Sequence, residues 1–287
     1  MKRLFHIIRD VIVVAIVAML ATLVVGLCTM QFDGITTPSG AYTDFGFMAT
    51  YFFSMLLIYL IVTRYERSSY KIIIPISHRR AGFDPTTILW GVILLIAMSI
   101  ALMPLAEHLP ADDRTFHNGE WTLLTTVVLA PIFEEYIFRG RLISLFQHNM
   151  PPSIAVLLAA TVFAFSHGIN VVTLSAFVSG IVFGYAYLLR RSIIAPIILH
   201  MCNNAIAYAL IVLSYQDKPL EEILDSSISY TSIYIAASAI IVIGIMHIIY
   251  TLRRADREAR AITIENETPT QESVQASSNH NSMNSAE

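Results

Sequence analysis

The sequence contains few charged residues. Asp, Glu, Lys and Arg make up 14% of its 287 residues, whereas hydrophobic residues make up 55% and the mean hydropathy is +0.63. A soluble domain carries about 25% charged residues. A chain this poor in charge lacks the polar side chains that cover a water-exposed surface, which excludes a soluble globular protein. We expect an all-α, polytopic integral membrane protein in contact with the lipid bilayer.

Cysteines are scarce, and internal repeats are missing. Cys28 and Cys202 both fall inside apolar segments, where they act as small apolar side chains, so no disulfide is implied. The sequence contains no internal repeat that can be aligned and no segment with the composition of a soluble domain. Because inverted repeats are typical of secondary transporters, this absence argues against a carrier.

Long apolar runs, in contrast, are abundant. Most of them approach the roughly 20 residues that cross about 30 Å of hydrocarbon as an α-helix. The fifth run is short for a crossing, at about 15 residues. We predict eight transmembrane helices, near residues 11–30, 46–63, 88–106, 122–139, 153–167, 172–189, 193–213 and 229–250.

Basic residues predict the orientation of these spans. With eight crossings and the N-terminus inside, all 18 Lys and Arg residues except Arg114 and Lys218 fall in segments on the cytoplasmic side. Cytoplasmic loops of membrane proteins carry an excess of Lys and Arg. We therefore predict a multi-pass protein of the cell membrane with both termini in the cytoplasm.

Composition divides the chain into four parts. Residues 1–119 form a scaffold of three transmembrane helices, and residues 120–215 form a core that contains the buried polar residues. Residues 216–251 hold an outer loop and the last transmembrane helix. Residues 252–287 form a cytoplasmic tail that starts as a charged helix end and becomes rich in Ser, Asn, Glu, Thr and Gln from residue 261. Such a composition predicts disorder.

Acidic side chains are absent from the predicted spans except for two neighbours, Glu134 and Glu135. A carboxylate at membrane depth is costly without a partner, so such residues face a polar cavity and mark functional sites. Glu135 and Arg139 are four residues apart, in the favourable order on a helix, and we predict that they pair. Glu134 points about 100° away and has no partner in the sequence, which makes it a candidate general base.

Two later spans each carry a polar pair with the same spacing. Phe163 and His167 share one helix face, where the aromatic ring can fix the orientation of the imidazole. His200 and Asn204 present two hydrogen-bond donors on another face, which suits the stabilisation of an oxyanion. Together with Glu134 these residues are suited to activating water. The alternative interpretation is that they only hold helices together through polar contacts.

Helix length determines whether these residues can meet. If the fourth helix ended at Arg139, Glu134 would lie only about 8 Å from its inner end, well below His167. A helix that continues to about residue 148 places Glu134 about 20 Å from that end, level with His167. We therefore predict the longer helix.

Two prolines lie about one turn before these polar residues. Pro131 lies three residues before Glu134, and Pro196 lies four before His200. A proline inside a span frees a backbone carbonyl, which is tolerated where a cavity or a polar group satisfies that carbonyl. This placement favours a polar, water-filled pocket.

The motifs resemble those of the CAAX protease and bacteriocin-processing (CPBP, or Abi) family of intramembrane endopeptidases. The family pattern is Glu-Glu-x-x-x-Arg, Phe-x-x-x-His and His-x-x-x-Asn on successive helices, which corresponds here to residues 134–139, 163–167 and 200–204. The resemblance covers about residues 120–215, and no motif position departs from the pattern. It implies a helical membrane fold whose catalytic core contains a cavity open toward the cytoplasm.

The resemblance also implies an activity and a role for each motif residue. Glu134 and His167 would activate a water that hydrolyses a peptide bond, and His200 and Asn204 would stabilise the oxyanion. The supporting residues would be Glu135, Arg139 and Phe163. Expected substrates are membrane-associated peptides or proteins, with no nucleic-acid partner. The short loops indicate a bacterial member, and bacterial members act in bacteriocin processing or self-immunity.

Three alternatives stay open. Family members were long classed as metalloproteases, and zinc could bind through His167 and His200. We expect no cofactor, because Asn204 is a poor zinc ligand but a good amide donor. The chain could instead be a proton-coupled transporter that uses Glu134 as its proton site. It could also be a non-catalytic membrane scaffold or immunity protein that sequesters a peptide.

Overall fold

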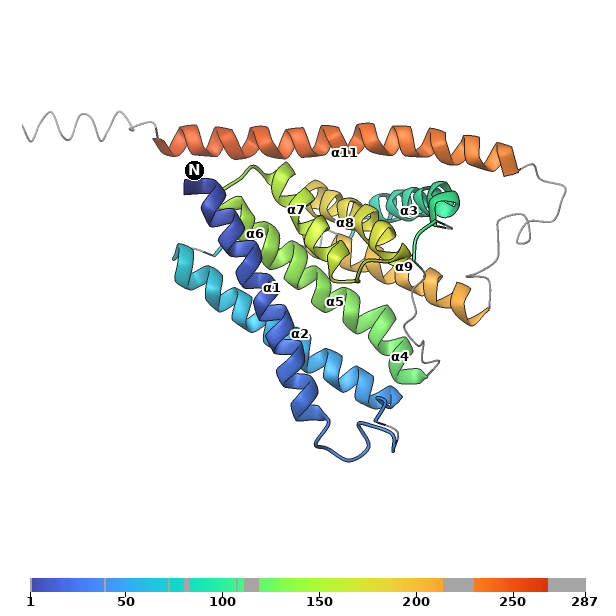
Figure 1. The fold of residues 1–287 in the computed structure, drawn as a ribbon. Coiled ribbons are helices and arrows are strands. Elements are labelled where there is room, and N and C mark those ends of the chain that lie inside the picture. Colours follow the sequence, from blue (N-terminus) through green and yellow to red (C-terminus); the bar gives the residue numbers. More distant parts are fainter. Residues whose placement is uncertain are drawn as a thin grey trace, which may run out of the picture.

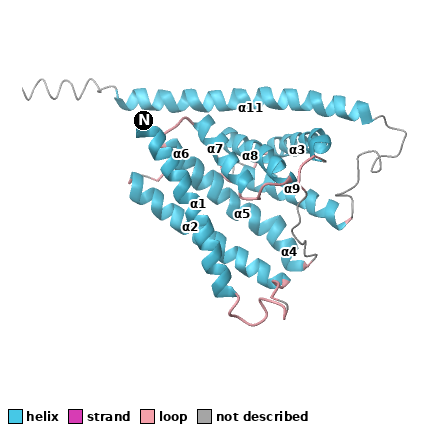
Figure 2. Ribbon diagram, viewed as in Figure 1, coloured by secondary structure: helices cyan, strands magenta, loops and turns pink. Residues whose placement is uncertain are grey.

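The protein is built from helices. The structure, a computed structural model, describes residues 2–38, 40–71, 73–79, 83–106, 108–110, 119–213 and 230–267. Within these ranges it contains no strand beyond one isolated bridge between Thr36 and Tyr42, and Figure 2 shows the helices in cyan. The predicted all-α class is therefore confirmed.

The helices follow the predicted spans in order. Five consecutive pieces, α4, η2, α5, η3 and α6, form one continuous helix, Glu120–Gln147, which is called the central helix below. The bounds are α1 Lys2–Thr29, α2 Asp44–Tyr70, α3 Pro85–Ala106, α4 Glu120–Leu124, η2 Thr125–Leu129, α5 Ala130–Glu135, η3 Tyr136–Leu142, α6 Ile143–Gln147, α7 Pro152–Phe165, α8 Val171–Arg190, α9 Ile194–Val212 and α11 Tyr230–Glu267.

Seven of the described helices are long and apolar enough to cross a membrane. The fifth predicted span corresponds to α7, which has only 14 residues and is about 21 Å long at 1.5 Å per residue. It is shorter than the hydrocarbon thickness of about 30 Å. The orientation predicted from eight crossings stays a prediction, and Arg114 and Lys218 lie outside the described residues.

The central helix lies between two groups of helices (Figure 1). α1 and α2 pack together on one side of it, and α7, α8 and α9 pack on the other. α7 and α8 approach closely because α8 is glycine-rich at the contact. A Cβ on Gly184 would lie 2.5 Å from Val156, and one on Gly180 would lie 3.0 Å from Ala160. This close packing fixes the end of α7, where Phe163 and His167 are located.

The prediction of disorder from residue 261 is wrong for residues 261–267, because α11 continues through the charged helix end at 252–260 as far as Glu267. This part of α11 is held by contacts with other elements. Asp256 accepts hydrogen bonds from the backbone N–H of Ser153, at 2.9 Å, and from its hydroxyl, at 2.6 Å. Glu258 pairs with Arg191. Residues 268–287 lie outside the described residues.

The helices also contain two buried acids beyond the predicted pair. Asp10 and Glu66 lie just outside the apolar spans, but α1 and α2 extend over them and both are fully buried. Asp10 accepts hydrogen bonds from Tyr65, at 2.6 Å, and Tyr70, at 2.5 Å. Glu66 accepts one from Arg141 at 3.1 Å. α1 and α2 are thus longer than the predicted spans, and partners on neighbouring helices stabilise the two acids that the extra turns bury.

Candidate active site

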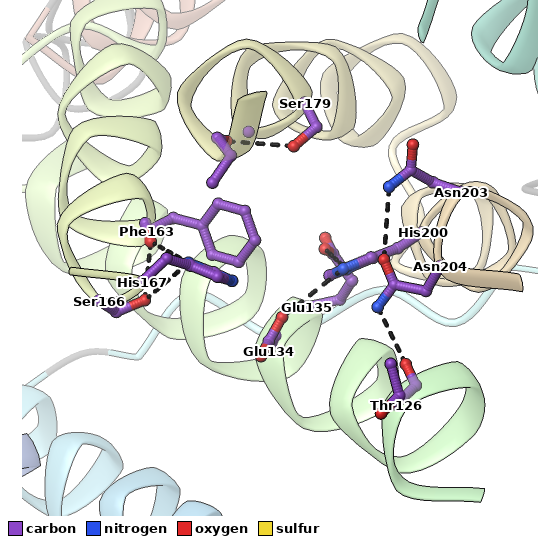
Figure 3. Close-up of polar contacts among 12 residues, drawn as sticks. Thr126, Glu134, Glu135, Phe163, Ser166, His167, Ser179, His200, Asn203 and Asn204 are labelled. Carbon is purple, nitrogen blue, oxygen red and sulfur yellow. Dashed lines mark hydrogen bonds and ion pairs between the residues drawn. The ribbon is translucent and has the colours of Figure 1, made fainter. Parts of the chain in front are cut away.

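The central helix is as long as predicted. It runs without a break to Gln147, so Glu134 lies 13 residues, or about 20 Å, from its C-terminal end. Glu134 and Glu135 both belong to α5 and are buried. The long helix places them beside the motif residues of α7 and α9, which lie around one region in Figure 3.

Before the glutamates the central helix forms a π-helical turn, η2. There the N–H of Ala130 donates to the carbonyl of Thr125, five residues back. In this pattern the carbonyl of Thr126 would accept from residue 131, but Pro131 has no N–H. The Asn204 side chain on α9 supplies the missing donor, with Nδ2 2.9 Å from the Thr126 oxygen (Figure 3). The carbonyl freed by Pro131 is thus satisfied by a motif residue.

Asn204 is further held by its neighbour. Asn203 Nδ2 donates to Asn204 Oδ1 over 3.3 Å, which orients the amide so that Nδ2 faces Thr126. A primary amide carries two N–H groups, so Asn204 keeps a second donor beyond the one given to Thr126. Asn204 therefore joins α9 to the central helix and retains one N–H for another acceptor.

Glu135 and Arg139 form the predicted pair. Arg139 Nη1 lies 2.8 Å from Glu135 Oε1, and the side chains are 1% and 0% exposed. Arg139 also donates to the carbonyl of Gly180 on α8 over 3.0 Å. Its guanidinium lies 4.9 Å from the Phe163 ring centre and 5.2 Å from that of Phe183. The buried cation is thus surrounded by one carboxylate, one carbonyl and two aromatic faces.

His200 lies between the two glutamates. Its Nδ1 is 2.8 Å from Glu135 Oε1, and its Nε2 is 3.6 Å from Glu134 Oε2. Because Glu135 is paired with Arg139 and accepts, Nδ1 carries a proton and donates. The ring stacks on Phe183, with centroids 4.5 Å apart and an interplanar angle of 24°. The sequence predicted only that His200 shares a helix face with Asn204, and the structure adds the two carboxylates beside its ring nitrogens.

His167 lies two residues beyond the end of α7, and one of its ring nitrogens has no hydrogen-bond partner in the described part of the chain. Its Nδ1 is 2.9 Å from the carbonyl of Phe163, and because a carbonyl can only accept, Nδ1 carries the proton. In the neutral ring Nε2 then has a lone pair, and it has no hydrogen-bond partner among the described residues. The ring stands edge-on to Phe163, with centroids 4.8 Å apart, so Phe163 orients His167 as predicted.

His167 and His200 lie on opposite sides of the space next to the glutamates (Figure 3). Phe163 lies between them, with its ring centroid 5.8 Å from that of His200. Within the described part of the chain no hydrogen bond joins His167 to either glutamate. The structure therefore brings Glu134, Glu135 and His200 into contact and leaves His167 facing them across a gap.

Sequence reasoning missed two side chains at the site, Tyr51 and Phe183, the ring that stacks on His200. The hydroxyl of Tyr51, on α2, donates to Glu134 Oε1 over 2.8 Å. Tyr51 lies in a span that was predicted as scaffold and contains no motif that would identify it. The available signal was its spacing of seven residues from Asp44, which places both polar groups on one face of α2.

The arrangement does not fit a metal ion. Among the residues that the structure describes, no group of three or more His, Cys, Asp or Glu side chains is placed to hold one. The two nitrogens of His200 face carboxylates, and Glu135 already bonds to Arg139. A zinc site would require these contacts to be exchanged for metal bonds.

The comparison with known families agrees with the resemblance to CAAX proteases that the three motifs indicate. Residues 117–206 match the family model described as type II CAAX prenyl endopeptidase Rce1-like. The match covers the central helix, α7, α8 and most of α9, and so includes all the motif residues. No curated protein and no solved structure matches the chain.

Proposed function

We propose that this chain, whose residues 117–206 form a CAAX-protease-type core, cleaves membrane-associated peptides or proteins at a site centred on Glu134. The family match supports intramembrane protease activity. The observation that carries the proposal is the position of the Glu134 carboxylate. Glu134 is 9% exposed, and its carboxylate lies next to the buried Glu135–Arg139 pair and faces His200 at 3.6 Å.

In the proposed reaction Glu134 is the general base. It takes a proton from a water that also donates to His167 Nε2, the free lone pair described above. The resulting hydroxide attacks the carbonyl carbon of the scissile peptide bond. Glu134 then returns the proton to the amide nitrogen as the C–N bond breaks. The reaction consumes one water and releases an amine and a carboxylic acid, which exchange a proton to become ammonium and carboxylate.

We propose that His200 and Asn204 stabilise the negative charge that develops on the carbonyl oxygen. His200 Nδ1 is occupied by Glu135, so Nε2 is the atom that can donate to an oxyanion when it carries a proton. Asn204 contributes its second amide N–H, because the first is used by Thr126. Glu135 and Arg139 act by holding His200 in this orientation.

The substrate class is proposed at the level of membrane-associated peptides. The family description names prenyl endopeptidases, but none of the described contacts selects for a prenyl group. Bacteriocin processing or self-immunity stays a prediction from the resemblance. The reaction is proposed to need no metal, because the proton transfers above use only side chains of this chain.

The test is cleavage by the purified Glu134→Gln variant. Wild-type protein in lipid nanodiscs is incubated with a library of membrane-inserted peptides, and the products are identified by mass spectrometry. We expect Glu134→Gln to lose at least about 100-fold in rate, the usual contribution of a general base. Glu120→Gln is the matched control, because it makes the same substitution at an exposed position of the same helix.

The outcomes separate the alternatives. A Glu134→Gln variant that cleaves at the wild-type rate removes Glu134 as the base. A wild-type protein that cleaves nothing, yet takes up protons in a Glu134-dependent manner, would be the proton-coupled carrier.

A further inference from the structure

Tyr51 reaches the candidate site from outside the segment matched by the family model. It lies on α2, whereas the match covers residues 117–206. Its hydroxyl donates to one oxygen of Glu134, Oε1, over 2.8 Å. The other oxygen, Oε2, faces His200 Nε2 at 3.6 Å. The carboxylate is therefore held between a donor on α2 and an imidazole on α9.

The position of Tyr51 is fixed from both ends of α2. At one end Asp44 accepts hydrogen bonds from the backbone N–H groups of Trp121, at 3.0 Å, and Thr122, at 2.8 Å. These N–H groups belong to the first turn of the central helix and have no partner within it. At the other end of α2, Glu66 pairs with Arg141 at 3.1 Å. α2 is thus attached to the central helix on either side of Tyr51.

An aromatic contact fixes the same register next to Glu134. Phe52 packs edge-on against Phe133, with ring centroids 5.3 Å apart and an interplanar angle of 86°. Phe52 follows Tyr51, and Phe133 precedes Glu134. The two residues that share the hydrogen bond therefore have neighbours that are packed against each other, and α2 cannot slide without breaking both contacts.

Glu134 needs such a contact because of its own flexibility. The last torsion of a glutamate side chain is broad, so nothing within the residue determines where each oxygen points. A donor to Oε1 fixes the plane of the carboxylate and thereby directs Oε2. A hydrogen bond from a phenol to a carboxylate is charge-assisted and stronger than a neutral one.

We propose that Tyr51 is a positioning residue: by holding Glu134 Oε1 it leaves Oε2, on the side of His200, as the oxygen that takes the proton of the reacting water. This inference rests on the proposed role of Glu134 as the general base. It adds a residue from the N-terminal helices to a site whose motif residues all lie in the core, so the core alone does not supply a correctly oriented base.

The experiment compares Tyr51→Phe with Tyr59→Phe in full-length protein in nanodiscs. Tyr59 is also on α2, its ring meets Tyr136 edge-on at 6.1 Å, and its hydroxyl has no hydrogen-bond partner among the described residues. Both variants remove one hydroxyl and keep the ring. With a peptide identified in the library screen, we expect Tyr51→Phe to lower kcat about 10- to 100-fold with KM unchanged. Tyr59→Phe should stay within about twofold of wild type.

A second measurement does not depend on activity. Infrared difference spectra between wild type and Glu134→Gln isolate the carboxyl bands of Glu134. We expect Tyr51→Phe to shift these bands, because the hydrogen bond to Oε1 is lost, and Tyr59→Phe to leave them in place. This shift would appear even if the protein cleaved no peptide, so a failure of the proposed function can be distinguished from a failure of the Tyr51 contact.

Three results would overturn the proposal. The first is an unshifted Glu134 band in Tyr51→Phe. The second is a normal kcat with a raised KM, which would make Tyr51 a substrate contact. The third is an activity loss that tracks a loss of folded protein and disappears when rates are normalised to folded enzyme, which would make its role structural.

Discussion

Removal of one member of the Glu135–Arg139 pair should destabilise the whole core. In Arg139→Ala, Glu135 stays buried at 0% exposure and loses its 2.8 Å partner. Leaving one charge of a buried pair uncompensated costs roughly 3–5 kcal/mol. The same variant removes the donor to the Gly180 carbonyl and the cation between Phe163 and Phe183, so the loss should lie toward the upper end of that range. Glu135→Gln should lower stability for the same reason, by leaving Arg139 unpaired.

The assay is unfolding of purified protein in mixed micelles by titration with a denaturing detergent. Arg254→Ala is the matched control, because Arg254 and Glu258 also form an i,i+4 pair at 3.0 Å but are 55% and 39% exposed. An exposed pair is worth about 0–1 kcal/mol, so this variant should unfold close to wild type. The double variant Glu135→Gln with Arg139→Met removes both charges and should be more stable than Arg139→Ala. If Arg139→Ala unfolds like wild type, or the double variant is the least stable, the assigned charge compensation is wrong.

Three further outcomes can be checked on the same preparations. Asn204→Ala should lower stability by about 1–3 kcal/mol, because the Thr126 carbonyl loses its donor. Adding Pro131→Ala supplies a backbone N–H and should restore stability, but it should not restore the cleavage rate. Restored cleavage would show that Asn204 acts only structurally. Protein treated with a chelator should keep its cleavage rate and contain substoichiometric zinc by elemental analysis, whereas activity lost on chelation and regained with zinc alone would reassign His167 and His200 as ligands. Glu66→Ala should lower stability by roughly 3–5 kcal/mol in the unfolding assay, because Arg141 would stay buried without its carboxylate, and an unchanged unfolding curve would contradict this.

The sequence alone determined the features that depend on composition and local spacing. Low charge and long apolar runs predicted a helical membrane protein, because hydrocarbon admits only backbones that satisfy their own hydrogen bonds. The Glu135–Arg139 pair and the Phe163–His167 contact were predictable, since residues four apart on a helix meet whatever surrounds them. The helix past Arg139 was also predictable, because only that length could bring Glu134 level with His167.

The apolar runs, however, gave the wrong ends for several helices. An apolar run ends near the first charged residue, so Asp10 and Glu66 were assigned outside the predicted spans. Residues 261–267 were assigned to a disordered tail because of their polar composition. In the structure the helices extend over all of them. The two acids can be buried because they have partners from elsewhere in the fold: Tyr65 and Tyr70 stabilise Asp10, and Arg141 stabilises Glu66.

Only the tertiary structure decided how the helices share the site. The contacts of Tyr51 with Glu134, His200 with Glu135 and Asn204 with Thr126 join residues that are 83, 65 and 78 positions apart. Each depends on how far one helix is rotated and shifted against another. The two π-helical segments of the central helix add to this, because each changes the direction of the side chains that follow. Helices that are apolar on almost every face carry no periodicity that would reveal their rotation, so the partners of Glu134 could be identified only once the helices were packed.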